Sequence, residues 1–420
     1  MPLYKDKTLL TDRILIIHYI YSIDLKQTLI FSRSGETQRM TKKVRFINTN
    51  QSTFYITVRK RVDAYFTENN ISIHANGAMW FKAAFFLTGL TVLYSSILFA
   101  SLSLPVLLLL AILLGVFAAF VGFNICHDAI HNAFSGRARV NQIFSFVFNL
   151  IGASPYVWNI CHNIVHHTYT NIAGHDEDID VAPGLIRFSD TETVNKLQRY
   201  QHFYAFALYS FSMLSWVFRK DYKKFFQHKI GAHRVIHPRI EYFKLFFYKT
   251  IYYFLFIALP LFVMPITWGQ FLIGFLAMQL AQGLVLGLVF QLAHVVEGTD
   301  FPIPNDQGNM EEAWAAHQMR TTANFAGGSK MAAFLCGGLN RQIEHHLFPK
   351  ICHIHYPAIG KIVKETAEEF NLPYIESITF VSALQSHYRT LRRLGKETYK
   401  ANKNINKEVF ILPESIGAVL

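Results

Sequence analysis

The stretch LPVLLLLAILLGVFAAFVGFNICHDAIH, residues 104–131, decides the fold, because an apolar run leads directly into two histidines. A transmembrane helix needs about 20 predominantly apolar residues, and the part from about Leu104 to Ile125 meets that length. His127 and His131 are four residues apart, so a helix places both imidazoles on one face. Neutral imidazole binds iron, zinc and copper well. The stretch therefore predicts a metal site where a transmembrane helix ends.

Three further apolar runs have membrane-spanning length. Together with 104–125, they give predicted spans at about 80–101, 242–264 and 271–292. The first two spans, and likewise the last two, are joined by a few residues without lysine or arginine, so each pair is expected to form a hairpin. Lys244 and Lys249 lie near one end of the third span, where their side chains can reach the headgroups.

Lysine and arginine are concentrated outside the spans, and the formal net charge is +12. The positive-inside rule places the basic regions, and with them both termini and all histidine blocks, in the cytoplasm. Basic residues next to spans favour anionic lipid as the partner, and no nucleic acid is expected. The cysteines show no CxxC spacing and are predicted to be free thiols on this reducing side: Cys126, Cys161, Cys336 and Cys352.

Two more histidine blocks follow along the chain, HNIVHH at 162–167 and QIEHH at 342–346. One histidine pair is more often a hydrogen-bonded accident than a metal site, but adjacent imidazoles in near-apolar sequence are costly to bury unless something satisfies them. Structural zinc sites use four ligands and favour cysteine, so seven histidines in three blocks suit two metals. A non-haem di-iron centre fits best, placed where a long acyl or alkyl chain can reach it from the membrane.

The chain divides into four expected regions. Residues 1–39 contain ILIIHYIYSI at 14–23, which is too short and too polar to span a bilayer; this extension is of doubtful significance, and Met40 is a natural start. The pattern at 54–70 indicates an amphipathic helix that lies either on the membrane or against the protein. The regions are the extension 1–39, a cytoplasmic arm 40–79, the domain 80–394 with all four spans, and the tail 395–420.

Two more apolar segments, 138–157 and 204–218, are expected to be interfacial or re-entrant. A single further crossing would place flanking histidine blocks on opposite sides of the membrane. The predicted fold is therefore an all-α integral membrane protein, with four transmembrane helices in two hairpins and a helical cytoplasmic cap that holds a histidine-rich di-iron site.

The blocks and their surroundings resemble the membrane fatty acid desaturase family. The context reads WNICHNIVHHTYTNIAGHDED at 158–178 and GGLNRQIEHHLFPKICH at 337–353, and the likeness covers about residues 54–394. The third block opens with glutamine, and in this it resembles the third block of front-end desaturases and of related bacterial acyl-lipid or acyl-CoA desaturases. The resemblance implies an oxygen-dependent enzyme that introduces a cis double bond into a lipid- or CoA-linked acyl chain, with two iron ions as cofactor and O2 reduced to two waters.

The resemblance also implies which residues hold the metal. His294, after the fourth span, is added because the family supplies a further ligand there. Gln342 replaces the histidine of the stearoyl type, and either its amide oxygen is a ligand or it holds a water. His317 is expected to support ligands without being one. The implied ligands are His127, His131, His162, His166, His167, His294, His345 and His346.

Metal-bound imidazoles need their other nitrogen fixed by a carboxylate or a carbonyl. The candidate partners are Asp128, Asp176, Asp178 and Glu344, each of which can equally be a solvated surface charge. Three further histidines stay unassigned: His175, His353 and His355.

The sequence contains neither the HPGG motif of a fused cytochrome b5 domain nor a glycine-rich dinucleotide motif. Electrons are therefore expected from a separate ferredoxin or cytochrome b5-like carrier with its reductase, which would dock on the basic face. The expected location is a bacterial inner membrane.

Two rival functions are considered. One is a di-iron hydroxylase of an acyl, alkyl or sphingolipid substrate, but the QIEHH block and the HDED segment favour desaturation over hydroxylation. Another is a membrane metal transporter, whose ligands belong near the bilayer midplane, whereas no histidine lies inside the predicted spans.

Overall fold

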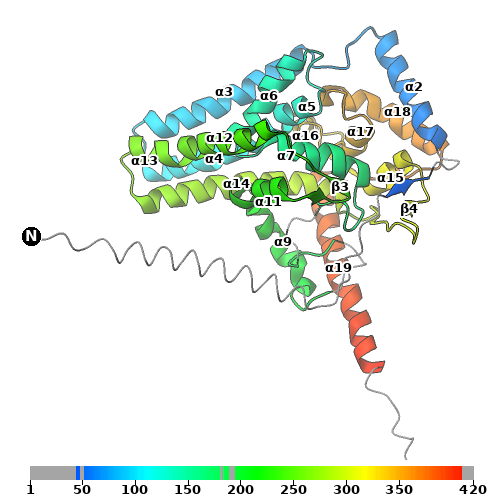
Figure 1. Ribbon diagram of the computed structural model, residues 1–420. Helices are drawn as coiled ribbons and strands as arrows, with labels where there is room; N and C mark the ends of the chain where they lie inside the picture. The colour runs from blue at the N-terminus through cyan, green and yellow to red at the C-terminus, as the bar shows by residue number, and fades with distance from the viewer. Residues whose placement is uncertain (1–43, 48–51, 180–181, 183, 189–193, 409–420) are drawn as a thin grey trace, which may run out of the picture. The chain divides into compact units, whose positions relative to one another are not determined.

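Four helices of the structure, a computed structural model, are long and apolar enough to cross a membrane, as predicted. The structure describes residues 44–47, 52–179, 182, 184–188 and 194–408, so the predicted extension 1–39 lies outside the described residues. The four helices are Gly77–Phe99 (α3), Leu104–Ile130 (α4 Leu104–Val121, η1 Gly122–Cys126 and α5 His127–Ile130), Arg239–Val263 (α12 Arg239–Tyr253, η5 Phe254–Ala258 and α13 Leu259–Val263) and Trp268–His294 (α14). They run alongside one another in Figure 1. The predicted all-α membrane fold is confirmed.

Short connections join these helices into the two expected hairpins. Ser103 precedes Pro105 in the first turn of α4, where proline costs no hydrogen bond. Thr267 and Gln270 form a capping box at the start of α14, which satisfies backbone N–H groups that a helix start leaves unpaired. Both connections lie at the ends opposite His127 and His294, so the histidine-bearing ends of α5 and α14 are on the same side.

Close packing of α4 on α14 brings those two ends together. A Cβ atom on Gly115 would collide with the backbone carbonyl of Met278, so the glycine allows the two backbones to approach. The side chains of Leu114, Phe275 and Met278 are buried in the same apolar cluster.

The segment after α5, for which an interfacial or re-entrant course is expected at 138–157, is a bent pair of helical pieces. Helix α6 (Ala138–Leu150) is followed at 108° by Pro155–Tyr169, which consists of α7 (Pro155–Trp158), η2 (Asn159–His166) and α8 (His167–Tyr169). By length and composition the bent pair is either re-entrant or a broken span. The other segment, 204–218, is divided among α9 (Gln201–Ser210), α10 (Ser212–Ser215) and η4 (Trp216–Lys220).

A buried ion pair holds the corner of this bent pair. Lys249 of α12 is 4% exposed, and its Nζ lies 2.8 Å from Asp221 Oδ2 and 2.9 Å from the carbonyl oxygen of Gly152. Asp221 also accepts hydrogen bonds from the Ser154 backbone N–H and the Trp216 indole. The prediction that Lys249 reaches the headgroups is therefore wrong, because a carboxylate inside the protein pairs with it.

Beyond the histidine-bearing ends, four helices share one core. They are α2 (Ser52–Glu68), α15 (Trp314–Thr321), α17 (Gln342–Leu347) and α18 (Tyr356–Glu369), labelled in Figure 1. Buried residues recur every fourth position of α2: Phe54, Val58, Val62 and Phe66. The apolar face of the 54–70 helix therefore packs against protein, which is one of the two predicted alternatives.

The remaining elements are short, apart from α19. They are η3 (Gln198–Tyr200), α11 (Asp221–Phe226), α16 (Lys330–Leu335), η6 (His353–His355) and α19 (Phe380–Glu408), with the strand pairs β1 (Arg45–Phe46) and β4 (Asn309–Met310), β2 (Lys229–Ile230) and β3 (His233–Arg234), and β5 (Asn324–Phe325) and β6 (Glu376–Ser377). The four cysteines are buried free thiols, as predicted.

Candidate metal centre

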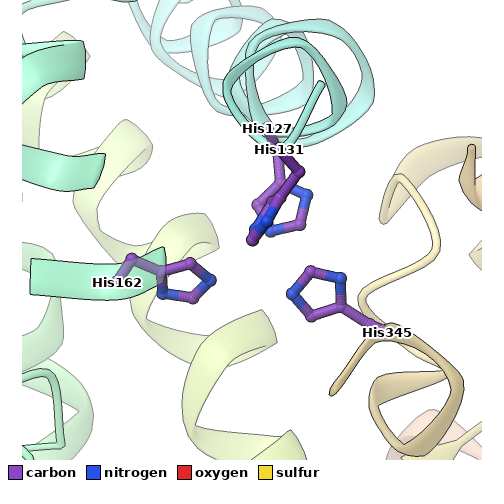
Figure 2. A group of neighbouring side chains, drawn as sticks. All are labelled: His127, His131, His162 and His345. Atoms are coloured by element: carbon purple, nitrogen blue, oxygen red, sulfur yellow. The ribbon is translucent and has the colours of Figure 1, made fainter. Parts of the chain in front are cut away.

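Four histidines from three distant segments point toward one another in the buried interior (Figure 2). His127 and His131 come from the end of the second span, His162 from η2 and His345 from α17. One ring nitrogen of each lies within 4.8 Å of the others, a grouping that can hold a metal ion. The two imidazoles of HDAIH share a face, as their spacing predicts.

A second group lies beside the first. His166, His294 and His346 bring their donor nitrogens within 4.8 Å of one another. A third grouping joins His167 to His345 of the first group and to His346 of the second. His167 therefore lies between the two groups. The structure thus brings together all eight histidines that the sequence implied as ligands, in two adjoining groups.

The second histidine block differs from the expected helix geometry. Residues Asn159–His166 form a π-helix, whose wider turn aligns positions five apart. The Nε2 atoms of His162 and His167 consequently approach to 3.2 Å, while His162 and His166 belong to different groups. A second π-helical turn, Gly122–Cys126, directly precedes His127. Residues four apart share a face only in a regular α-helix, so the spacing within this block did not predict the division between two sites.

Hydrogen bonds on the outer nitrogens orient several of the rings. His166 Nδ1 donates to Asp176 Oδ2 at 2.8 Å, His162 Nδ1 to Asp178 Oδ2 at 3.2 Å and His346 Nδ1 to Gln318 Oε1 at 2.7 Å. With the proton held on Nδ1, each Nε2 carries the lone pair that a metal needs. Asp176 and Asp178 therefore occupy the supporting positions that the sequence suggested.

Several ring nitrogens of these histidines have no hydrogen-bond partner among the described residues. They are buried, and they include both ring nitrogens of His127, Nε2 of His131, His166 and His345, and Nδ1 of His167. Burying a polar atom without a partner costs free energy, and one unpaired histidine would be an anomaly. So many unpaired nitrogens on converging rings fit an all-nitrogen donor set for metal ions.

The electrostatic environment differs between the rings: burial opposes charge on His166, but the Asp176 carboxylate outweighs it and raises the pKa of His166. Burial lowers the pKa of His345 and His346 well below the usual histidine range, and neighbouring imidazoles lower it further. A neutral imidazole is the form that binds metal. His345 and His346 can therefore bind metal at neutral pH without first losing protons.

Gln342 lies against the second group. Its amide nitrogen is 2.9 Å from His294 Nε2 and 3.3 Å from His346 Nε2, and its Oε1 is buried with no partner among the described residues. Amide nitrogen and oxygen are assigned from such networks, so either atom can face a metal held by these histidines. Both predicted roles, as a ligand or as a support for a water, are compatible with this place.

The other predicted supporting residues contact different partners. Asp128 Oδ2 accepts from His353 Nδ1 at 2.8 Å, while its Oδ1 is 3.9 Å from His127 Nδ1, too far for a hydrogen bond. Glu344 is buried and binds the Tyr374 hydroxyl and the Asn324 amide, so it holds the third block in place and is not a solvated charge. His317 contacts the Thr170 carbonyl at 2.8 Å and belongs to neither group, and burial lowers its pKa to about 4.

Some supporting residues were missed by the sequence interpretation. Gln318 orients His346, and the Tyr356 hydroxyl lies 3.3 Å from His345 Nδ1. The unassigned His353 links Asp128 to Lys82 of α3, whose Nζ is 3.0 Å from His353 Nε2. No local pattern identifies such partners, because they come from helices that meet only in the folded chain.

An apolar cavity of about 150 Å³ opens beside the first histidine group. His127 and His162 line it, and Trp158 stacks on the His162 ring at 4.2 Å between centroids. Its apolar walls include Phe123, Phe148, Trp216, Leu286 and Phe290. The arrangement allows a hydrocarbon chain to reach the histidines.

Replacing Asp176 with asparagine is expected to lower activity about 10- to 100-fold, the usual cost of losing a partner of a metal ligand. The amide keeps the size of the carboxylate but removes the charge that fixes His166. Steady-state activity per bound metal ion measures the effect. Asp306→Asn, in a solvent-exposed turn, is the matched control, and equal activities of the two variants would contradict the assignment.

Comparison with known proteins gives consistent matches. The fatty acid desaturase family profile matches residues 101–378. The acyl-lipid (8-3)-desaturase of Physcomitrium patens is 35% identical over 369 residues, covering 87% of this chain and 77% of the relative. The sn-1 linoleoyl-lipid 6-desaturase of Synechocystis sp. is 36% identical over 351 residues, covering 83% and 97%. A protein of the same name from Arthrospira platensis is 35% identical over 341 residues, covering 80% and 91%.

Proposed function

The chain belongs to the fatty acid desaturase family, and from this membership we infer a membrane fatty acyl desaturase whose two histidine groups hold two iron ions. The observation that carries this proposal is the pair of adjoining histidine groups beside an apolar cavity. A metal transporter does not require such a cavity, and the relatives' names favour desaturation over hydroxylation.

We propose that His127, His131, His162 and His345 hold one iron, and that His166, His294 and His346 hold the other, with His167 between them. When bound there, iron with O2 supplies the oxidising power that an unactivated C–H bond requires. Asp176, Asp178 and Gln318 keep the protons on the outer ring nitrogens, so the inner ones stay available.

The cavity is proposed to hold the acyl chain during the reaction. Its aromatic and aliphatic walls fix one stretch of hydrocarbon against His127 and His162. Fixing the reacting atoms in this way removes much of the entropic part of the barrier. Removal of hydrogens from adjacent methylenes, with formation of a cis double bond, requires a chain that does not slide.

The substrate is proposed to be an acyl group in a membrane glycerolipid, with the new double bond counted from the carboxyl end. Support comes from the names of the relatives, which act as acyl-lipid (8-3)- and linoleoyl-lipid 6-desaturases. Gln342, which opens the third histidine block, also supports this substrate, because front-end desaturases have glutamine there. An acyl-CoA substrate is the alternative to be tested beside it.

Electrons are proposed to come from a separate ferredoxin or cytochrome b5-like carrier. Exposed Lys and Arg side chains lie on the helices around the histidine groups, Arg219 among them, and can attract an acidic carrier. We propose that this side faces the cytoplasm, because the span-connecting segments on the opposite side contain no lysine or arginine.

The test is mass spectrometry of fatty acid methyl esters from a host that expresses this chain, beside the His166→Ala variant. A new unsaturated acid that forms only with the intact chain, located by derivatisation of its double bond, is the expected result. A hydroxylated acid would instead support the hydroxylase alternative. No new lipid, despite good expression and a suitable donor, would contradict the proposal.

Gln342→Ala is expected to reduce product formation at least about tenfold, because the second group loses the amide that contacts His294 and His346. Iron content and turnover of the purified variant are measured together. Gln307→Ala, at an exposed turn, is the control. Wild-type turnover in Gln342→Ala would exclude both roles considered for the amide.

A further inference from the structure

One corner of the acyl cavity is charged, although the rest is largely apolar. Lys220, at the end of η4, and Asp178 both line the cavity, with Nζ 3.3 Å from Asp178 Oδ1. The ammonium also lies 4.9 Å from the centre of the Trp216 ring. The Lys220 side chain is 30% exposed and the Asp178 side chain 6%, so the lysine is the member of the pair that solvent and ligands can reach.

This corner is close to the metal centre. Asp178 Oδ1 faces Lys220, and Asp178 Oδ2 accepts from His162 Nδ1 at 3.2 Å. A single carboxylate therefore separates the lysine from a histidine of the first group. If Lys220 binds an oxygen atom of the acyl group, only a short stretch of acyl chain lies between that oxygen and the histidines.

A second polar side chain indicates that the cavity receives more than hydrocarbon. Gln291 of α14 lines it and is fully buried, and neither its amide oxygen nor its amide nitrogen has a hydrogen-bond partner among the described residues. An unpaired buried amide is costly, and an alkane would leave it unpaired. An acyl ester or thioester introduces oxygen atoms that can accept from such a donor.

We propose that Lys220 binds the acyl carbonyl oxygen and thereby sets the position of the new double bond relative to the carbonyl. An ammonium has three N–H donors, so the hydrogen bond to Asp178 leaves donors for the substrate. Asp178 offsets the charge, which allows a lysine beside apolar walls. Lys220 is then a specificity-determining residue; this inference rests on the proposed desaturase function.

The experiment compares the iron-loaded full chain with Lys220→Met and Lys220→Arg, each in lipid nanodiscs with glycerolipids carrying linoleoyl chains or their shorter and longer homologues. Lys223→Met, an exposed lysine on the following helix, is the matched control. A parallel series with the same acyl groups as CoA thioesters distinguishes the two carbonyl sources. Double-bond positions, KM, kcat and iron content are measured for each protein.

The wild type and Lys223→Met are expected to place the double bond at one distance from the carbonyl for every chain length. Lys220→Met is expected to give a mixture of positions and a KM raised about tenfold or more, the effect of losing one charged hydrogen bond, with iron content unchanged. Lys220→Arg, which keeps the charge and the donors, is expected to retain a single product.

Two results would overturn the inference. One is a wild-type product pattern and KM in Lys220→Met. The other is loss of iron from Lys220→Met, which would show that the lysine acts on His162 through Asp178 and not on the substrate. If the wild type itself forms no unsaturated product, the proposed function fails, and that outcome is distinguishable from both.

Discussion

The His345→Ala substitution is expected to lower desaturation activity by more than about 100-fold and to cause loss of iron. This is the largest effect that we expect from a single substitution. His345 belongs to the first histidine group and also to the grouping with His167 and His346, so its removal weakens both proposed iron sites. The expected loss exceeds the 10- to 100-fold that is typical for partners that only support a ligand. The readouts are product formation by methyl-ester analysis and iron per chain by elemental analysis.

The matched control is His228→Ala, a histidine with an exposed side chain far along the chain from the three blocks. It removes the same chemical group without touching either histidine group, so activity and iron content should match the wild type. Normal iron content and activity in His345→Ala would show that the converging rings do not hold the metal.

Lys249→Met should destabilise the protein by about 3–5 kcal/mol, because it leaves Asp221 buried in the protein without its cation. Asp221 would still accept hydrogen bonds from the Ser154 backbone and the Trp216 indole, but the charge would be uncompensated. The corner of the bent helix pair that carries His162 depends on this carboxylate. Thermal unfolding in detergent or nanodiscs, followed by near-UV circular dichroism, measures the change.

Lys244→Met is the comparison variant on the same helix. Its lysine pairs with Glu241 at 2.8 Å, but the side chain is 44% exposed, so we expect a change within about 0.5 kcal/mol. The double variant Lys249→Met with Asp221→Asn, which removes both charges, should recover part of the loss. If Lys249→Met and Lys244→Met unfold at the same temperature, the ion pair does not stabilise the corner.

The transmembrane helices and the histidines could be predicted because both signals are local in the sequence. Runs of apolar residues determine the four spans without reference to tertiary contacts. The eighth histidine, His294, was added only through the resemblance to a family, and the structure places it with His166 and His346. Its own surroundings in the sequence are those of an ordinary residue at a helix end.

The division of the histidines into two groups could not be predicted from spacing. It depends on the π-helical turn that sends His162 and His166 to different sites, and spacing rules assume a regular α-helix. The partners of Lys249 and Asp128 were missed for a related reason. Asp221 and His353 are distant in sequence, and only the packing of separate helices brings these charges together.

The most direct test of the central claim is a single-turnover experiment on the purified chain. The iron-loaded protein is chemically reduced, given acyl lipid without oxygen, and then exposed to O2, and iron and new double bonds are counted in the same sample. We predict two iron ions per chain and up to one new double bond per iron pair. One iron or none per chain, or a product without a new double bond, would contradict the account.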